Sequence, residues 1–208
     1  MDVKTFKPLP VGNEDFPSLR EKGHYYVDKT PYLKSVFTDP SSVLLFTRPR
    51  RFGKTLLMDM FSSFLRLAPD GSNNRAYKEK LFDGLEILKD REFTDKYMGQ
   101  FPVIFISLKE VFGKTFEEAY DALARVIVEL FSQNKNLLDS KKLSEYDIEN
   151  FRKYLNRDFL CNISAIGYVK ESLKFLSNCL YKHYGKKVIL LIDEYDVPLA
   201  KASDNIYP

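Results

Sequence analysis

The sequence has few of the residues from which metal centres, catalytic triads and disulfide frameworks are built. Of its 208 residues, two are histidine and two are cysteine. Two histidines are too few for a zinc site or a triad, and Cys161 and Cys179 show neither metal-ligand nor CxxC spacing. We therefore expect two reduced, partly buried thiols and a cytoplasmic protein.

Long apolar runs and a strong excess of one charge are also absent. No run approaches the roughly 18 apolar residues of a membrane-spanning helix, and the first residues lack the apolar core of a signal peptide. The net charge is only +3, from 32 basic and 29 acidic residues, so direct nucleic-acid binding is not predicted. A content of 44% hydrophobic and 29% charged residues fits a globular protein with one large domain, or a domain with an appendage.

Short apolar runs alternate with helical patterns along the chain. We expect buried strands over residues 43–46, 102–108 and 188–192. Helices are expected over residues 31–37, 54–67, 77–88, 92–97, 115–133 and 143–155, and from Val169 to a cap at Gly185. The polar helices over 77–88 and 92–97 are expected on the outside. This alternation predicts an α/β fold with a mostly parallel sheet covered by helices on both faces, a three-layer sandwich.

A phosphate-binding pattern follows the first apolar run, Val43-Leu44-Leu45-Phe46. A phosphate cradle is usually G-x-x-x-x-G-K-[ST] between a strand and a helix, with inward N–H groups, a lysine for the outer phosphates and a hydroxyl for magnesium. Gly53, Lys54 and Thr55 match its end, whereas Arg48 stands at the first glycine position. The alternative is an ordinary strand–turn–helix corner with a surface lysine.

A pair of acids, Asp193 and Glu194, ends the last apolar run. Carboxylates at the carboxyl end of a buried strand lie where the ligands of parallel sheets bind. In a nucleotide site Asp193 would hold magnesium and Glu194 would polarise the water that attacks the γ-phosphate. The alternative is a strand that ends in solvated acids. Together the two motifs favour a P-loop NTPase fold with a nucleoside triphosphate site.

The candidate site residues follow from these two motifs. Lys54 and Glu194 are the expected catalytic residues, and Thr55 and Asp193 are the expected metal ligands. The expected nucleotide contacts come from the loop and the first helical turn, namely Arg48, Pro49, Arg50, Arg51, Phe52, Gly53, Lys54, Thr55 and Leu56. The three arginines either add positive potential near the phosphates or are solvated. We expect a lead-in with a short helix over residues 1–42, packed on a core over 43–208.

Further stretches over nearly the whole chain share one family's pattern. They are Leu9-Pro10-Val11-Gly12, Asp15-Phe16, Arg20, Tyr26-Val27-Asp28-Lys29-Thr30, the loop from Arg48 to Thr55, Leu81-Phe82-Asp83-Gly84-Leu85, Pro102-Val103-Ile104, Leu180-Tyr181-Lys182-His183-Tyr184-Gly185 and Leu191-Ile192-Asp193-Glu194-Tyr195-Asp196. In them the chain resembles the AAA-ATPase-like family of bacterial P-loop proteins. Arginine at the first glycine position looks like this family's own variant of the loop. The resemblance implies an ATP-binding module that uses ATP and Mg²⁺, often joined to a C-terminal nuclease-like domain.

The same resemblance implies a further strand after the acid pair, between the loop strand and the acid-pair strand. The chain stops at Tyr207-Pro208, so we expect a fold truncated after the Walker B strand, which is the strand that ends at Asp193. ATPase activity is expected if the missing part is supplied, and an oligomer is compatible with this expectation. No nuclease activity is expected, because that domain is absent here.

Two questions stay open from the sequence. Residues 26–30 are distinctive of the family: Tyr25 or Tyr26 could stack on adenine, or Asp28 and Thr30 could organise the start of the next helix while the tyrosines pack. The second role is favoured. For the whole chain, an ATPase that drives a conformational change competes with a nucleotide-gated switch or scaffold without turnover, and with a nucleic-acid-associated module of a nuclease-linked protein.

Overall fold

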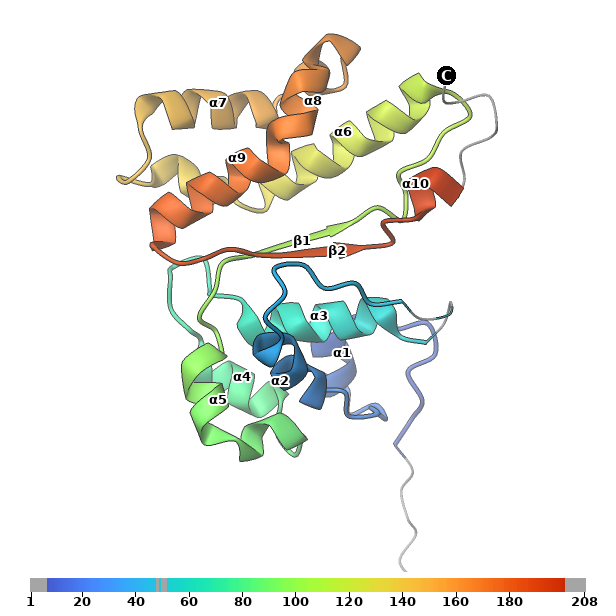
Figure 1. The fold of residues 1–208 in the computed structure, drawn as a ribbon, viewed down its shortest axis with the longest axis vertical. Helices are drawn as coiled ribbons and strands as arrows, with labels where there is room; N and C mark the ends of the chain where they lie inside the picture. The colour runs from blue at the N-terminus through green and yellow to red at the C-terminus, as the bar shows by residue number, and fades with distance from the viewer. Residues whose placement is uncertain (1–6, 48, 50–51, 201–208) are drawn as a thin grey trace, which may run out of the picture. The chain divides into compact units, whose positions relative to one another are not determined.

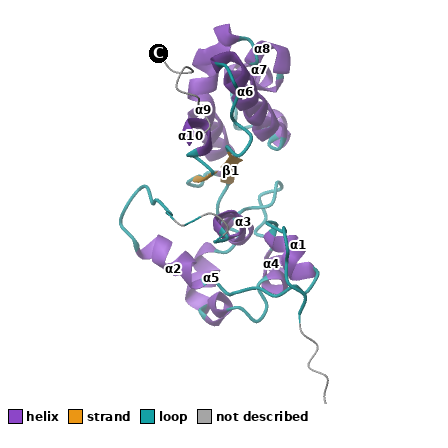
Figure 2. Cartoon of the chain, turned by 90° about the vertical axis from the view of Figure 1, so that its right-hand side faces the viewer, coloured by secondary structure: helices purple, strands orange, loops and turns teal. Residues whose placement is uncertain are grey.

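The protein forms two compact units, Met1–Phe101 and Pro102–Pro208, and each is described here by itself. A computed structural model describes residues 7–47, 49 and 52–200. Helices dominate the described residues, and both described strands lie in the second unit (Figure 2). An α/β fold with dominant helices and a small parallel sheet is compatible with a P-loop-like fold.

The first unit is a group of short helices (Figure 1), and aromatic side chains pack between them. Its elements are α1 (Phe16–Glu21), α2 (Pro31–Thr38), α3 (Lys54–Leu65), α4 (Arg75–Leu81), a 3-10 turn (Glu86–Lys89) and α5 (Arg91–Tyr97). The fully buried ring of Phe82 contacts Phe16 of α1 and Phe64 of α3, with centroid distances of 5.0 and 5.4 Å. Buried aromatic pairs of this kind supply much of the energy of a small core.

Helix α3 confirms the helix expected after the phosphate-binding pattern, although it ends two residues earlier. The chain leaves the helix at Arg66, which forms an isolated parallel bridge with Phe101. The N–H of Leu67 donates to the carbonyl of Phe101 at 2.8 Å, and the N–H of Phe101 donates to the carbonyl of Leu65 at 3.0 Å. Pairing with a distant segment therefore replaces the last helical turn.

The single helix expected over residues 77–88 is wrong. Helix α4 stops at Leu81, Gly84 takes a φ of 73°, and a separate 3-10 turn follows. The N–H of Glu86 donates to Asp28 Oδ2 at 2.7 Å and the N–H of Ile87 donates to Thr30 Oγ1 at 3.2 Å. Asp28 and Thr30 thus accept hydrogen bonds from backbone N–H groups that would donate within the helix if it were continuous. The segment is also not wholly outside, because Phe82 is buried.

The strand expected over residues 43–46 is also wrong, since residues 43–47 are irregular. Val43 is 85% exposed and Leu45 is 67% exposed, while the ring of Phe46 lies 6.0 Å from that of Phe61. A strand exists only through hydrogen bonds to a neighbour. Among the described residues, no backbone hydrogen bond involves this segment. An apolar run is thus insufficient without a ladder partner.

The second unit contains the parallel strand pair that the sequence predicts. Its elements are β1 (Val103–Ser107), α6 (Phe116–Ser132), 3-10 turns at Lys135–Asp139 and Ile163–Ala165, α7 (Glu145–Leu155), α8 (Arg157–Leu160), α9 (Ile166–Tyr184), β2 (Ile189–Asp193) and α10 (Val197–Ala200). Strands β1 and β2 pair in parallel, with Val103 opposite Ile189 and Ser107 opposite Asp193. The expected strands over 102–108 and 188–192 are therefore confirmed.

Helices of the second unit bury one face of this strand pair (Figure 1). Ile104 and Ile106 of β1 belong to the same buried cluster as Ile127 and Leu130 of α6 and Leu176 of α9. The start of α7 is fixed by a reciprocal capping box between Ser144 and Asp147, and α9 ends at Gly185 with a φ of 67°. The expected helices over 115–133 and 143–155 and the expected cap at Gly185 are confirmed.

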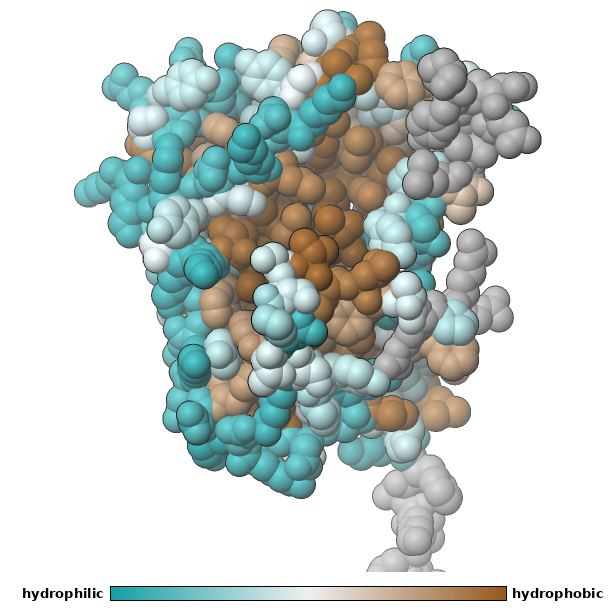
Figure 3. All heavy atoms as spheres, viewed as in Figure 1, coloured by the Kyte–Doolittle hydropathy of each residue, from teal (hydrophilic) through white to brown (hydrophobic). Residues whose placement is uncertain are grey.

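Apolar side chains gather over the strand pair and the neighbouring part of α6 in Figure 3, and Leu190 of β2 is 42% exposed. The third layer of the expected sandwich stays a prediction, as does a division between residues 42 and 43.

Within the described part of the chain, no helix has the length and apolar character needed to cross a membrane.

Lys78 is a buried cation of the first unit. It is 5% exposed, and its Nζ donates to the carbonyl of Ser63. Burial, with a smaller effect of Arg66, lowers the pKa of Lys78 to about 8. In the unfolded chain the pKa of a lysine is about 10.4. Between about pH 8 and about pH 10.4, the unfolded chain therefore keeps a proton on Lys78 that the folded protein has lost. Stability should therefore rise with pH in this window.

We expect Lys78→Met to remove up to about 3 kcal/mol of this pH-dependent gain in unfolding free energy. Urea unfolding of both proteins at about pH 7.5 and about pH 10 measures it. Lys80→Met, which changes an exposed lysine on the same helix, should keep the wild-type dependence. The same rise with pH in wild type and Lys78→Met would contradict the assignment.

Candidate functional site

The start of α3 has the backbone conformation that a phosphate-binding loop requires. Gly53 precedes the helix with φ 70° and ψ 40°, a left-handed conformation that side chains disfavour. Phe52 before it is 59% exposed, and Lys54 and Thr55 begin the helix as half-buried residues. Gly53, Lys54 and Thr55 thus form the turn into α3, and their role at a phosphate site stays a prediction. Arg48, Arg50 and Arg51 lie outside the described residues, and their contacts stay a prediction.

The same helix end can attract an anion. The N–H of Leu57 donates to the carbonyl of Gly53 at 3.1 Å, the first intrahelical bond of α3. The N–H groups before it have no acceptor within the helix, and Gly53 has no side chain with which to accept from them. These donors and the positive end of the helix dipole face the same direction. With the ammonium group of Lys54 in that turn, the arrangement suits phosphate.

Residues 26–30 fix the segment before α2. Asp28 Oδ1 accepts from the N–H and the hydroxyl of Thr30, at 2.8 and 2.7 Å, and Thr30 is fully buried. The ring of Tyr26 packs edge-on against Phe16 at 5.2 Å, and burial raises the pKa of Tyr26 to about 12. These contacts favour the structural role over stacking on adenine. Thr30 does not cap α2 with its side chain; its hydroxyl oxygen accepts from the N–H of Ile87 instead.

Lys29, in the same segment, reaches the loop. Its Nζ donates to the carbonyl of Phe52 at 3.0 Å. Sequence reasoning did not identify this residue, because the contact joins positions 23 residues apart and no local pattern reports it.

The acid pair occupies the carboxyl end of β2. Asp193 is its last residue and is 4% exposed, and its carbonyl accepts from the N–H of Leu108 at 3.0 Å. Ser107 ends β1 directly opposite Asp193. Sequence reasoning missed Ser107, although the carboxyl ends of parallel strands meet at one edge of a sheet. A hydroxyl and a carboxylate thus lie side by side at this edge.

Glu194 has an unusual backbone. Its φ is 53°, in the left-handed region that costs a non-glycine residue about 1–2 kcal/mol. The chain turns here from β2 into α10, and the N–H of Val197 donates to the carbonyl of Glu194 at 3.1 Å. Strained residues of this kind cluster at functional sites, and the action of Glu194 on a ligand stays a prediction.

No metal centre made of protein ligands alone is present in the described residues. Across those residues, no three His, Cys, Asp or Glu side chains come together in a way that could hold a metal ion. Magnesium usually keeps several waters and binds through one or two carboxylates plus phosphate oxygens. Asp193, at the end of β2, offers a carboxylate of this kind, and its role as a magnesium ligand stays a prediction.

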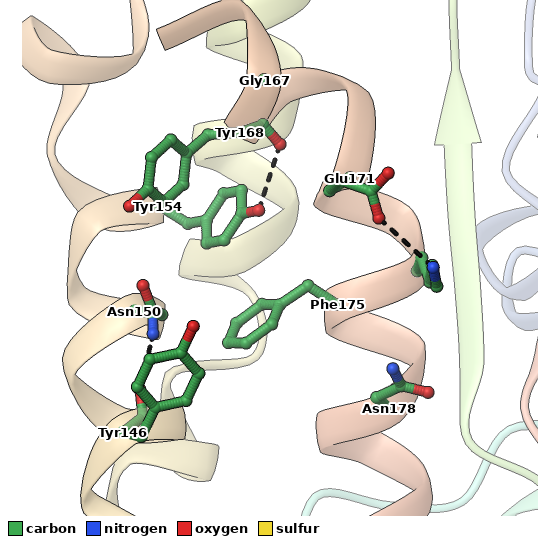
Figure 4. A pocket seen from close by; sticks show the side chains of 9 residues that line it. Tyr146, Asn150, Tyr154, Gly167, Tyr168, Glu171, Phe175 and Asn178 are labelled. Atoms are coloured by element: carbon green, nitrogen blue, oxygen red, sulfur yellow. Dashed lines mark hydrogen bonds and ion pairs between the residues drawn. The ribbon is translucent and has the colours of Figure 1, made fainter.

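A separate hollow of about 320 Å³ lies between α7 and α9 of the second unit (Figure 4). Tyr154 stacks on Phe175 at 5.2 Å and donates from its hydroxyl to the carbonyl of Tyr168 at 3.1 Å. Asn150 Nδ2 donates to the carbonyl of Tyr146 at 2.9 Å. The hydroxyl of Tyr154 thus links α7 to α9, the amide of Asn150 bonds within α7, and none of the predicted site residues lines the hollow.

Comparison with known proteins identifies a family for nearly the whole chain. The family described as "Predicted AAA-ATPase" matches residues 10–206. A curated protein of Azotobacter chroococcum mcd 1, described as "Uncharacterized protein in vnfD 5'region", is 27% identical over 194 residues. That match covers 93% of this chain and 30% of the Azotobacter protein, so the chain spans less than a third of its relative. No solved structure matches the chain.

The left-handed backbone at Glu194 gives a stability prediction. Glu194→Gly and Glu194→Ala both remove the carboxylate, but only glycine relieves the strain. We expect the glycine variant to unfold with a free energy about 1 kcal/mol higher than that of the alanine variant. Urea unfolding measures the difference. As a control, the same two changes at Glu149, an exposed position within α7, should favour alanine. Equal stability of Glu194→Ala and Glu194→Gly would show that the backbone at position 194 is not strained.

Proposed function

The chain belongs to the predicted AAA-ATPase family, and on that premise we propose that it is an ATP-binding module. It binds ATP with Mg²⁺, and hydrolysis drives a conformational change rather than making a metabolite. The observation that carries the proposal is the left-handed turn at Gly53, which begins α3 with Lys54 and Thr55 in its first turn. That turn supplies the donors and the charge that a triphosphate needs.

The first unit supplies the phosphate-binding residues in this proposal. Gly53 and the first-turn N–H groups of α3 bind the inner phosphates, and Lys54 neutralises the charge of the outer ones. The arginines at 48, 50 and 51 add positive potential to the same loop, and Pro49, Phe52 and Leu56 complete the contacts proposed for it. Phosphoryl transfer depends mainly on positioning and charge neutralisation, so Lys54 serves catalysis as well as binding.

Three residues handle metal and water in this proposal: Thr55 of the first unit, and Asp193 and Glu194 of the second. Thr55 and Asp193 are the proposed magnesium ligands, and magnesium when bound would neutralise phosphate charge. Glu194 orients the attacking water and accepts its proton. Supporting observations are the burial of Asp193, its place at the carboxyl end of a parallel strand, and the left-handed backbone of Glu194.

A second candidate is a nucleotide-gated switch or scaffold without turnover. The irregular conformation of residues 43–47, which lead into the loop, favours it. A segment with apolar side chains as exposed as Val43 and Leu45 can change its packing when the loop binds phosphate. Steady phosphate release that depends on Glu194 would exclude this candidate.

Two substitutions separate binding from turnover. Lys54→Ala should abolish ATP binding, because the outer phosphates lose their counter-charge. Glu194→Gln should leave binding intact and stop phosphate release, because the amide cannot accept the proton from water. Calorimetry with Mg·ATP and a phosphate-release assay measure the two effects. Lys22→Ala and Glu149→Gln, at exposed positions outside the site, should match wild type. Equal ATP affinity in wild type and Lys54→Ala would remove the proposal.

The nucleotide base is tested by thermal stabilisation. A ligand that binds the native state alone raises the melting temperature, by an amount set by its concentration and affinity. We expect a larger rise with ATP than with GTP, and a larger rise with magnesium than without it. Equal rises with ATP and GTP would contradict the choice of adenine and leave phosphate binding in place.

A further inference from the structure

Lys29 contacts a peptide bond next to the proposed phosphate site. Lys29 Nζ donates to the carbonyl of Phe52 at 3.0 Å. A Cβ added at Gly53 would lie 2.9 Å from this same Nζ, closer than real Cβ atoms come to other atoms. Glycine at position 53 therefore permits the positive φ, and with glycine there the ammonium group keeps its place without a shift of the lysine side chain.

The backbone of Lys29 is held on both sides. Asp28 accepts from the N–H of Glu86, and Thr30 accepts from the N–H of Ile87 and is fully buried. Both neighbours of Lys29 are thus tied to the turn before α5. A lysine on a fixed backbone keeps its ammonium group in one region more reliably than a lysine on a mobile loop does.

The orientation of the peptide between Phe52 and Gly53 decides whether the loop offers an N–H group or a carbonyl oxygen to a ligand. In a trans peptide the carbonyl and the N–H point to opposite sides of the chain. By bonding the carbonyl of Phe52, Lys29 turns the N–H of Gly53 the other way. A flip of this peptide would exchange the two groups, and it is easy at glycine, which adopts both signs of φ. The flipped loop would present a carbonyl oxygen, which repels phosphate.

We propose that Lys29 is a positioning residue of the phosphate loop, which holds the Phe52–Gly53 peptide with its N–H available to an anion. This role rests on the proposed ATP site, and it adds to that site a residue that lies outside the loop motif. The N–H groups of such loops bind the α- and β-phosphates, which ATP and ADP share. Lys29 therefore acts on diphosphates and triphosphates alike.

The test compares Mg·ATP and Mg·ADP affinities of wild type, Lys29→Met and Lys29→Arg by calorimetry. The methionine side chain cannot donate a hydrogen bond, so we expect both affinities to fall by about tenfold, the loss of one charged hydrogen bond. The ratio of ATP to ADP affinity should not change. Lys29→Arg can still donate to the carbonyl and should stay within about threefold of wild type. Lys22→Met, which removes one exposed positive charge elsewhere, should bind as wild type does.

Three results would overturn the positioning role. Unchanged affinities in Lys29→Met would do so and leave the proposed function standing, since wild type would still bind ATP. A larger loss for ATP than for ADP would show that Lys29 contacts the γ-phosphate instead. A fall in nucleotide-free melting temperature that Lys29→Arg also shows, with no rescue of affinity, would make the contact merely structural. If wild type itself binds neither nucleotide, the proposed function fails first.

Discussion

One backbone constraint supports the account of the first unit: the left-handed turn at Gly53. It ends the loop, begins α3 and directs the first-turn N–H groups of that helix outward. The turn also admits the ammonium group of Lys29 beside the chain, at the carbonyl of Phe52. A side chain at position 53 would strain this conformation, and its Cβ would lie 2.9 Å from Lys29 Nζ unless the lysine side chain shifted. Lys54 and Thr55 lie where they do because α3 starts at this turn.

The sequence predicts those parts of the fold whose cause is local. Strands β1 and β2 form where continuous apolar runs predict them, and α6, α7 and the cap at Gly185 follow from periodicity, capping residues and glycine. The errors have long-range causes. Residues 43–46 are as apolar as β2 but pair with no neighbour among the described residues, so they form no strand. The expected helix over 77–88 is broken because Asp28 and Thr30 accept from its backbone.

The candidate site shows the same limit. Gly53, Lys54 and Thr55 could be predicted as candidates from their spacing, because the loop-to-helix turn is encoded within a few residues. Asp193 and Glu194 could be predicted as candidates because a polar pair directly follows an apolar strand. Lys29 and Ser107 could not, since each lies beside a candidate segment through a partner distant in sequence, the carbonyl of Phe52 and strand β2 respectively. The strain at Glu194 is likewise visible in its φ of 53° and not in its residue type.

The proposed function assigns phosphate binding to the Gly53 turn and magnesium binding to Asp193. The most direct measurement is the calorimetric affinity for ATP with and without Mg²⁺, in wild type and in Asp193→Asn. The account predicts that magnesium strengthens ATP binding in wild type, and that Asp193→Asn loses this gain while it keeps the magnesium-free affinity that the loop provides. The same gain from magnesium in both proteins would contradict it, because the acid pair would then play no part in binding the metal–nucleotide complex.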